Sequence, residues 1–270
     1  MHTPFTRGVR GDDASRRVAT ILRVVAVAGA LLTSVSCSDS TPPDKTPDKS
    51  GTFFGPSAAM ADGSARAYVS LDSAGTPTEI GLAFSESALT GLPTGAAEFV
   101  LALPSQASAT PFKHAVINWV PNGHPPAGVY TVPHFDFHFY TITDAERAAI
   151  VSVTDAKMTR LPAAEFIPAG YAAGMASVGM GLHWNDPDAP ERKGEPFTKT
   201  FIYGSYDGAI IFAEPMVAKS YLETKPTVAT TPLKLPTQYS ARGYQPTTYT
   251  VGYDAVAKEH RIAISGLVSR

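Results

Sequence analysis

The sequence is poor in cysteine and in net charge. Cys37 is the only cysteine among the 270 residues, so the chain has no internal disulfide and no paired-cysteine metal site. The formal net charge is −2, which gives no electrostatic basis for binding nucleic acid. The folded part must therefore rely on an ordinary hydrophobic core or on a bound ion.

Several motifs of well-known catalytic sites are also missing. The chain contains no phosphate-binding Walker loop, no GxGxxG fingerprint and no nucleophile elbow. Ser205 lies between Gly204 and Tyr206 but lacks the strand–turn–helix context that a catalytic serine needs. The sequence therefore leaves open whether the protein is an enzyme.

The N-terminal segment has the pattern of an export signal. The apolar run 24–35 has signal-peptide length and is short for a membrane-spanning helix. It leads into Cys37, so residues 1–37 resemble a bacterial lipoprotein signal whose cysteine becomes acylated, although Ser34 stands where leucine is usual. The basic residues that precede the run are Arg16, Arg17 and Arg23.

Two alternatives to a lipoprotein signal remain. One is a plain signal peptide cut near Ser36, which would leave an unpaired thiol in an exported protein. The other is a twin-arginine signal at 15–17, whose remaining motif is poor. We expect a chain in the cell envelope, attached to a membrane by a lipid on Cys37, on the periplasmic or the extracellular face.

The rest of the chain divides into a linker and one domain. Residues 38–50 are polar and rich in Pro, Ser, Thr and Lys, a composition that predicts a flexible tether. Residues 51–270 suit a single domain, because β-barrels and sandwiches of roughly 200–250 residues are common.

Dense turn residues, 22 Gly and 23 Pro, separate short β-like runs. A hairpin is expected around the Asp207-Gly208 turn, and another joins the last two strands near 255–259. Helix signals are few: a capping box at 143–146 opens a helix to about Val151, and single turns are expected at 87–92 and 216–223. This pattern predicts a mainly β sandwich or barrel-like domain with one or two short helices. The expected strands are 65–71, 79–84, 98–103, 115–120, 129–140, 178–184, 198–203, 209–213, 247–253 and 261–267.

Residues 133–140, with the sequence PHFDFHFY, alternate strictly between aromatic and polar side chains. A β-strand would send three phenylalanines to one face, and His134, Asp136, His138 and Tyr140 to the other. The phenylalanine row indicates a central strand, whose polar face would be covered and would need partners. This favours a metal or substrate site over a solvated face, or over a closed network in which Asp136 accepts from both histidines.

The strand geometry restricts how these residues would bind one ion. His134 and His138 lie about 13 Å apart along the backbone, from a rise of about 3.3 Å per residue. Asp136 with either histidine is the workable pair, and the remaining histidine must reach inward or support a ligand.

Three further residues are candidates from other segments. His124 lies in a proline-bounded turn, where it either packs on prolines or is presented as a ligand from the mouth of the sheet. His183 lies on the polar face of an expected strand, and Glu214 closes an apolar strand as a ligand, as a general base or as a charge that reaches solvent. His114 has no obvious partner, and His260 lies in a charged turn where it is expected to be solvated.

Imidazole and carboxylate together suit a divalent transition metal such as Zn, Fe or Cu. His134, Asp136 and a distant His183 also match the two-histidine, one-carboxylate pattern of non-haem iron sites. Arg192 follows His183 at the spacing of an oxo-acid clamp, but residues 185–193 indicate an exposed loop, which argues against that role.

Six short segments carry a resemblance to a known family: Trp119, 123–126 (GHPP), Tyr130, 133–140 (PHFDFHFY), 181–184 (GLHW) and Phe212 with 214–216 (EPM). Together they resemble an uncharacterised family of bacterial exported proteins, the TTHB-like domain of unknown function. The resemblance covers most of residues 51–216. It implies an exported β-rich domain that self-associates as a homo-oligomer, and it supplies no activity and no catalytic residue.

The sequence thus predicts an exported β-domain with a histidine/carboxylate site for a divalent transition metal. The alternative is a non-catalytic self-associating or ligand-binding module, in which the polar strand face is structural. The candidate metal ligands are His124, His134, Asp136, His138, His183 and Glu214.

Overall fold

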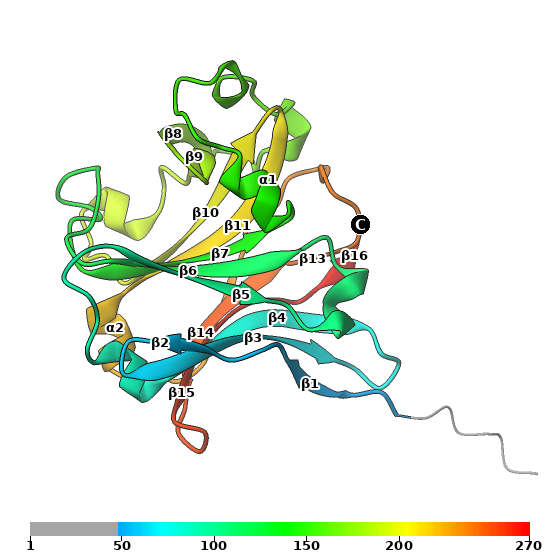
Figure 1. Cartoon of the computed structure of the whole chain (residues 1–270). Helices are drawn as coiled ribbons and strands as arrows, with labels where there is room; N and C mark the ends of the chain where they lie inside the picture. Colours follow the sequence, from blue (N-terminus) through cyan, green and yellow to red (C-terminus); the bar gives the residue numbers. More distant parts are fainter. Residues whose placement is uncertain (1–47) are drawn as a thin grey trace, which may run out of the picture. The chain divides into compact units, whose positions relative to one another are not determined.

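The computed structural model describes residues 48–270 (Figure 1). The expected signal segment 1–37 with Cys37, and the linker up to residue 47, lie outside the described residues. The described residues all belong to one compact unit of the chain. Within this part of the chain, no helix has both the length and the apolar character needed to cross a bilayer.

Two seven-stranded sheets account for most of the structure, and every strand pair in residues 48–270 is antiparallel. The first sheet contains β1 (Gly51–Phe54), β2 (Ala58–Met60), β3 (Gly63–Leu71), β4 (Pro77–Ser85), β12 (Ala229–Pro232), β14 (Thr248–Asp254) and β15 (Glu259–Ser265). Its order is β1-β3-β4-β15-β14-β12, with β2 paired to β3 outside this order.

The second sheet carries the residues of interest. It contains β5 (Ala97–Ala102), β6 (His114–Val120), β7 (His134–Tyr140), β8 (Ala172–Ser177), β9 (Gly181–Asn185), β10 (Lys199–Tyr206) and β11 (Ala209–Ala218). Its order is β5-β6-β7-β11-β10-β9-β8, so β7 is a central strand between β6 and β11 (Figure 1). The short strands β13 (Tyr244–Gln245) and β16 (Val268–Ser269) pair separately. The mainly β prediction is confirmed.

The two sheets share one hydrophobic core, to which β7 contributes a row of phenyl rings. Phe135, Phe137 and Phe139 are fully buried, and the Phe137 ring stacks on Phe84 of β4 with ring centroids 5.9 Å apart. Burying one such ring contributes about 1.5–3 kcal/mol. The alternation along β7 therefore places its other row of side chains, which includes His134, on the face turned away from this core.

The helices are short, as expected. Thr143 and Glu146 form the capping box of α1 (Asp144–Ala148): the Thr143 hydroxyl accepts from the Glu146 amide at 3.2 Å, and the Glu146 carboxylate accepts from the Thr143 amide at 2.8 Å. The helix α2 covers Lys219–Glu223. Single 3₁₀ turns lie at η1 (Glu86–Leu89), η2 (Ser105–Ala109), η3 (Ala156–Met158), η4 (Ala164–Phe166) and η5 (Pro190–Lys193).

Both predicted hairpins are confirmed. Asp207 and Gly208 join β10 to β11 with positive φ angles of 52° and 82°. Two consecutive positive φ angles define a type I′ turn, whose twist matches that of the flanking strands and which favours Asp-Gly. The last hairpin joins β14 to β15 through residues 255–258.

Three expected segment boundaries are wrong. The strand expected at 129–140 begins only at His134, because the preceding residues form a loop in which the His124 amide donates to the Tyr130 carbonyl at 3.0 Å. The segment expected at 178–184 is a tight hairpin, since Gly179 and Gly181 adopt positive φ and turn β8 into β9.

The third error concerns the strand that ends in Glu214. Strand β11 continues through Pro215 to Ala218, so the helix expected from Met216 begins only at Lys219. Because proline has no N–H to donate, it is rare in central strands. The register between β7 and β11 is correspondingly interrupted at Glu214 and Pro215, between the pairs Ala213–Phe139 and Met216–Asp136.

Candidate metal centre

The polar row of β7 meets residues from two other strands of the same sheet and from one loop. His138 and Glu214 of β11 face each other across the interrupted register, with His138 Nε2 3.4 Å from Glu214 Oε2. His183 comes from β9, and its Nε2 lies 3.9 Å from the same oxygen. His124 comes from the loop before β7, and its ring centroid lies 4.8 Å from that of His134.

The six predicted residues form two groups of identical composition. We call His124, His134 and Asp136 the first group, and His138, His183 and Glu214 the second group. In each group the potential ligand atoms, one per residue, all lie within 4.8 Å of one another. Each group combines one fully buried histidine of β7, one buried carboxylate and one partly buried histidine.

Backbone carbonyls fix the orientation of three of the four histidines. Because a carbonyl oxygen only accepts, each Nδ1 must be the protonated donor: His124 donates to Pro125 at 2.8 Å, His134 to Val132 at 2.7 Å, and His183 to Met175 at 2.9 Å. A neutral imidazole that donates from Nδ1 carries its lone pair on Nε2. Such a bond to the backbone is the usual way in which a metal-ligating histidine is oriented.

A bulge in the edge strand places the acceptor for His183. The pairing between β8 and β9 shifts register between Ala173 and Ala176, so that residues 174 and 175 lie opposite His183. The Met175 carbonyl accepts from the His183 ring there. Bulges of this kind re-aim side chains next to functional sites.

A glycine and an aromatic ring position the second group. Gly204 of β10 lies opposite His183 in the register, and a Cβ atom there would lie 1.9 Å from the Phe212 ring. The absence of that side chain lets Phe212 pack edge-on against His138 and His183, with ring centroids 4.8 and 5.4 Å away. Both imidazoles are thereby held from one side.

Several buried polar atoms in the two groups have no hydrogen-bond partner. The Nε2 atom of His134 lies 3.2 Å from Asp136 Oδ1, yet the contact lacks hydrogen-bond geometry. Native structures leave few such atoms unpaired, so each one needs an explanation. The unpartnered atoms are His134 Nε2, Asp136 Oδ1, both ring nitrogens of His138, and Glu214 Oε2.

The first group favours a charged pair. Burial alone would lower the pKa of His134, but the adjacent Asp136 carboxylate outweighs it and raises that pKa above its usual value. Burial likewise raises the pKa of Asp136, and the contact with His134 outweighs it and lowers the pKa. A proton therefore sits on His134 and faces an ionised carboxylate when no other cation is present.

The second group favours neutral forms. Burial lowers the pKa of His138 to about 3, and burial also lowers the pKa of His183. Burial and the negative charge of Asp136 raise the pKa of Glu214 well above its usual value. Glu214 therefore keeps its proton between two neutral imidazoles. That proton can form a hydrogen bond with only one of the two Nε2 atoms, of His138 or of His183.

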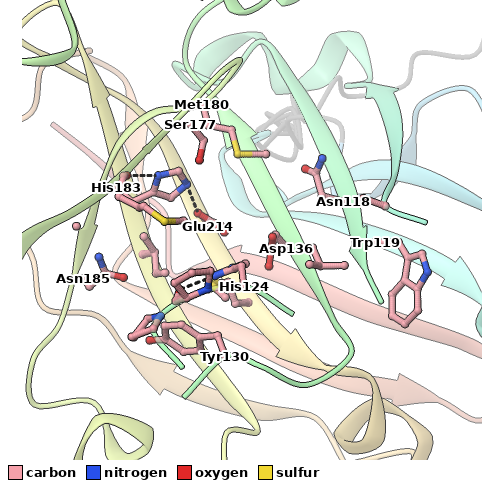
Figure 2. Close-up of a pocket in the computed structure, with 18 of the residues that line it drawn as sticks. Asn118, Trp119, His124, Tyr130, Asp136, Ser177, Met180, His183, Asn185 and Glu214 are labelled. Carbon is pink, nitrogen blue, oxygen red and sulfur yellow. Dashed lines mark hydrogen bonds and ion pairs between the residues drawn. The ribbon is translucent and has the colours of Figure 1, made fainter. Parts of the chain in front are cut away.

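The two groups open into a cavity of about 630 Å³. His124, Asp136, His183 and Glu214 line it, whereas His134 and His138 lie behind them, fully buried. Figure 2 shows the lining residues pointing into one common space, with His183 beside Glu214 and with Asp136 and His124 nearby. A cavity of this size suits a small molecule.

The structure therefore brings all six predicted residues together and leaves the other histidines of the described chain outside. His114 stacks on Tyr140 with ring centroids 4.9 Å apart. The expectation that His260 is solvated is wrong: it is fully buried and stacks on Phe84 at 5.1 Å. The alternation of β15 turns its charged neighbours Glu259 and Arg261 away from the core and His260 into it.

The expectation of an exposed loop at 185–193 is also wrong in part. Glu191 is buried and accepts a hydrogen bond from the Tyr130 hydroxyl at 2.9 Å. Arg192 lines the cavity together with Asn185. The sequence shows that this segment is polar. It does not show that Glu191 can be buried because Tyr130, far away in the chain, donates a hydrogen bond to it.

Comparison with known proteins adds a resemblance without an activity. The family model described as "TTHB210-like: Hypothetical protein TTHB210" matches residues 72–119. The chain is similar to this uncharacterised family over that segment, so the expected resemblance is confirmed there and not over the whole of residues 51–216. The matched segment ends within β6, so it contains none of the six residues of the two groups. No curated protein and no solved structure matches the chain.

Proposed function

We propose that the domain binds divalent transition metal ions, one in each of the two groups. The observation that carries the proposal is the set of buried, unpartnered nitrogen and oxygen atoms that face one another within both groups. Without a metal ion, His134 must carry a second proton to face Asp136 at 3.2 Å, and that contact still lacks hydrogen-bond geometry. Two imidazoles and a carboxylate form a donor set that Zn and Fe accept, and imidazole also suits Cu.

A closed polar network without metal is the competing explanation. In such a network, each buried donor would face an acceptor at hydrogen-bond geometry. Here His138 Nε2 and His183 Nε2 both approach Glu214 Oε2, and at most one proton is available for both contacts. A single ion would satisfy all three atoms at once, which is why metal binding is the better explanation.

A bound ion would keep coordination positions open toward the cavity, because each group supplies three protein ligands. An open position on a divalent ion supports Lewis-acid chemistry or the activation of bound water. The residues of each group would bind and orient the ion. Because His124 and His183 line the cavity, each ion would lie at its wall. Catalysis would require that a molecule in the cavity reach the open coordination position with a group that the ion can polarise.

The metal proposal is tested by elemental analysis of the full chain, purified without a metal-binding tag. We expect up to two ions per chain, and we expect His134→Ala and His138→Ala each to remove one. Saturation about a hundredfold above the dissociation constant stabilises the folded state by about 2.7 kcal/mol, so melting should follow metal content.

The control is His260→Phe, which alters a buried histidine outside the groups and should keep both ions. A chain that is metal-free, with melting indifferent to both zinc and chelator, would support the structural polar network. That result would also favour the non-catalytic, self-associating or ligand-binding module.

We also propose that the domain is exported and anchored by a lipid on Cys37. The support is the sequence pattern of residues 1–37 alone. The mature chain should partition into detergent, and Cys37→Ser should move it to the aqueous phase. Equal membrane attachment of the variant would contradict the anchor.

A further inference from the structure

One positively charged side chain lines the cavity without belonging to the first or the second group. Arg192 is the only lysine or arginine among the described residues that line it. Its guanidinium lies over the Tyr130 ring, 5.6 Å from the centroid. The Tyr130 ring thereby holds the side chain at the cavity wall. The N–H groups of Arg192 remain available to a partner that lies in the plane of the guanidinium.

Arg192 lacks the carboxylate partner that four of the other six arginines in residues 48–270 have. Arg66, Arg147 and Arg261 each form an ion pair with a carboxylate at 3.0 Å or less. Arg192 forms no ion pair with the described residues, and its Nε is buried without a hydrogen-bond partner. The adjacent carboxylate does not serve it, because Glu191 accepts from the Tyr130 hydroxyl.

The remaining walls of the cavity are largely apolar. A small molecule with a hydrophobic body would displace water from these walls, and its binding would be favoured in proportion to the apolar surface that is buried. A planar guanidinium with free N–H groups suits a carboxylate, to which it donates two parallel hydrogen bonds. The apolar lining residues are Trp119, Val120, Met175, Val178, Met180, Ile202 and Met216.

We propose that the cavity binds a small organic acid whose carboxylate pairs with Arg192 and whose apolar body lies against the methionines and Trp119. This inference rests on the proposed metal function, because three carboxyl groups also line the cavity: Glu98, Asp136 and Glu214. Glu98 is paired with Arg147, and divalent ions in the two groups would supply the positive charge that favours an anion beside Asp136 and Glu214.

Benzoate is the probe, because it combines one carboxylate with a compact apolar ring, and benzamide is its neutral counterpart. Titration calorimetry on the zinc-loaded full chain should detect benzoate binding and at least tenfold weaker binding of benzamide. Arg192→Gln should lower the affinity for benzoate at least tenfold while the zinc content stays unchanged. Arg160→Gln, which alters an exposed arginine paired with Asp207, is the matched control and should bind benzoate like the wild type.

The outcomes separate the two proposals. A chain that holds no zinc contradicts the metal function, and the present inference then falls with it. A chain that holds zinc but does not bind benzoate contradicts only the organic-acid inference. Equal benzoate affinity of wild type and Arg192→Gln also overturns it, since the metal alone would then be capturing the carboxylate. Thermal melting and zinc content of each variant verify that the fold is retained.

Discussion

The two groups contain the same three kinds of side chain, yet they differ in where protons reside. In the first group, the pKa of His134 is raised and that of Asp136 is lowered, so the pair is ionised. In the second group, burial lowers the pKa of His138 to about 3 and, with the charge of Asp136, raises that of Glu214, so all members are neutral. The presence of one negative charge at Asp136 makes a second, nearby negative charge unfavourable.

The groups also differ in the segments that supply them. All members of the second group come from strands, with His183 tied to the backbone of β8. The first group takes His124 from a loop, and this ring donates only to the next residue, Pro125. The same three kinds of side chain thus come from strands alone in the second group and partly from a loop in the first group. The effects of charge on stability and of loop flexibility on metal affinity can therefore be tested separately.

The charge difference predicts the largest effect. In the metal-free protein, Asp136→Asn should cost about 3 kcal/mol of unfolding free energy, because breaking a buried charged pair costs about 3–5 kcal/mol and His134 limits the loss by releasing its proton. Glu214→Gln should cost less than Asp136→Asn, since a neutral side chain replaces a neutral one and no charged pair is broken. Urea unfolding in the presence of chelator measures both, and equal losses would refute the charge assignment.

His260 is a buried histidine outside the two groups, and the Glu86 carboxylate only partly opposes the effect of its burial. Burial lowers its pKa to about 4, and the pKa of an unfolded-chain histidine is about 6.5. Because the folded pKa is the lower one, the unfolded state takes up a proton first. Stability is therefore fully present above pH 6.5 and is lost as the pH falls toward 4, by roughly 2–3 kcal/mol.

The variant His260→Phe removes this titration while it keeps the stacking on Phe84 and the tilted ring contact with Tyr253. Its unfolding free energy should fall less steeply than that of the wild type between pH 6.5 and 4. Denaturant unfolding at several pH values provides the measurement. An unchanged dependence of the unfolding free energy on pH would mean that unfolding does not protonate His260. Burial alone would then not explain the lowered pKa values assigned to the histidines of the second group.

The difference in rigidity predicts the smallest effect. His183→Ala should weaken zinc binding at the second group about tenfold more than His124→Ala weakens it at the first group. A ligand on a loop loses conformational freedom when it binds, so its net contribution to affinity is smaller. Competition titrations with a zinc indicator give both affinities, and each is compared in a background where the other group is inactivated. An equal loss at both groups would show that the loop is as ordered as the strands.

The sequence was sufficient where a local rule fixes the structure. The alternation of residues 134–140 predicted a central strand with a polar face, the Thr143–Glu146 box predicted α1, and Asp207-Gly208 predicted the hairpin turn. Each of these signals depends on neighbours in the chain alone. They located the strand that carries His134, Asp136 and His138.

The pairing of ligands could not be read from the sequence, because it depends on the order of strands. Spacing along β7 showed that His134 and His138 were too far apart for one ion, but not that Glu214 would face His138 across a strand pair. Proline at 215 concealed the continuation of β11. The exposed edge strand β8 carries no apolar alternation, so its carbonyl contact with His183 was not foreseeable either.

The position of Met175 has a consequence for how fast an ion would be exchanged. Among the strands of residues 48–270, β8 pairs with β9 alone, and Met175 is 47% exposed. Edge segments with few neighbours open at a lower free-energy cost than the centre of a sheet. Each opening of β8 would remove the acceptor that fixes the His183 ring, so an ion of the proposed second site would dissociate faster while this edge is open.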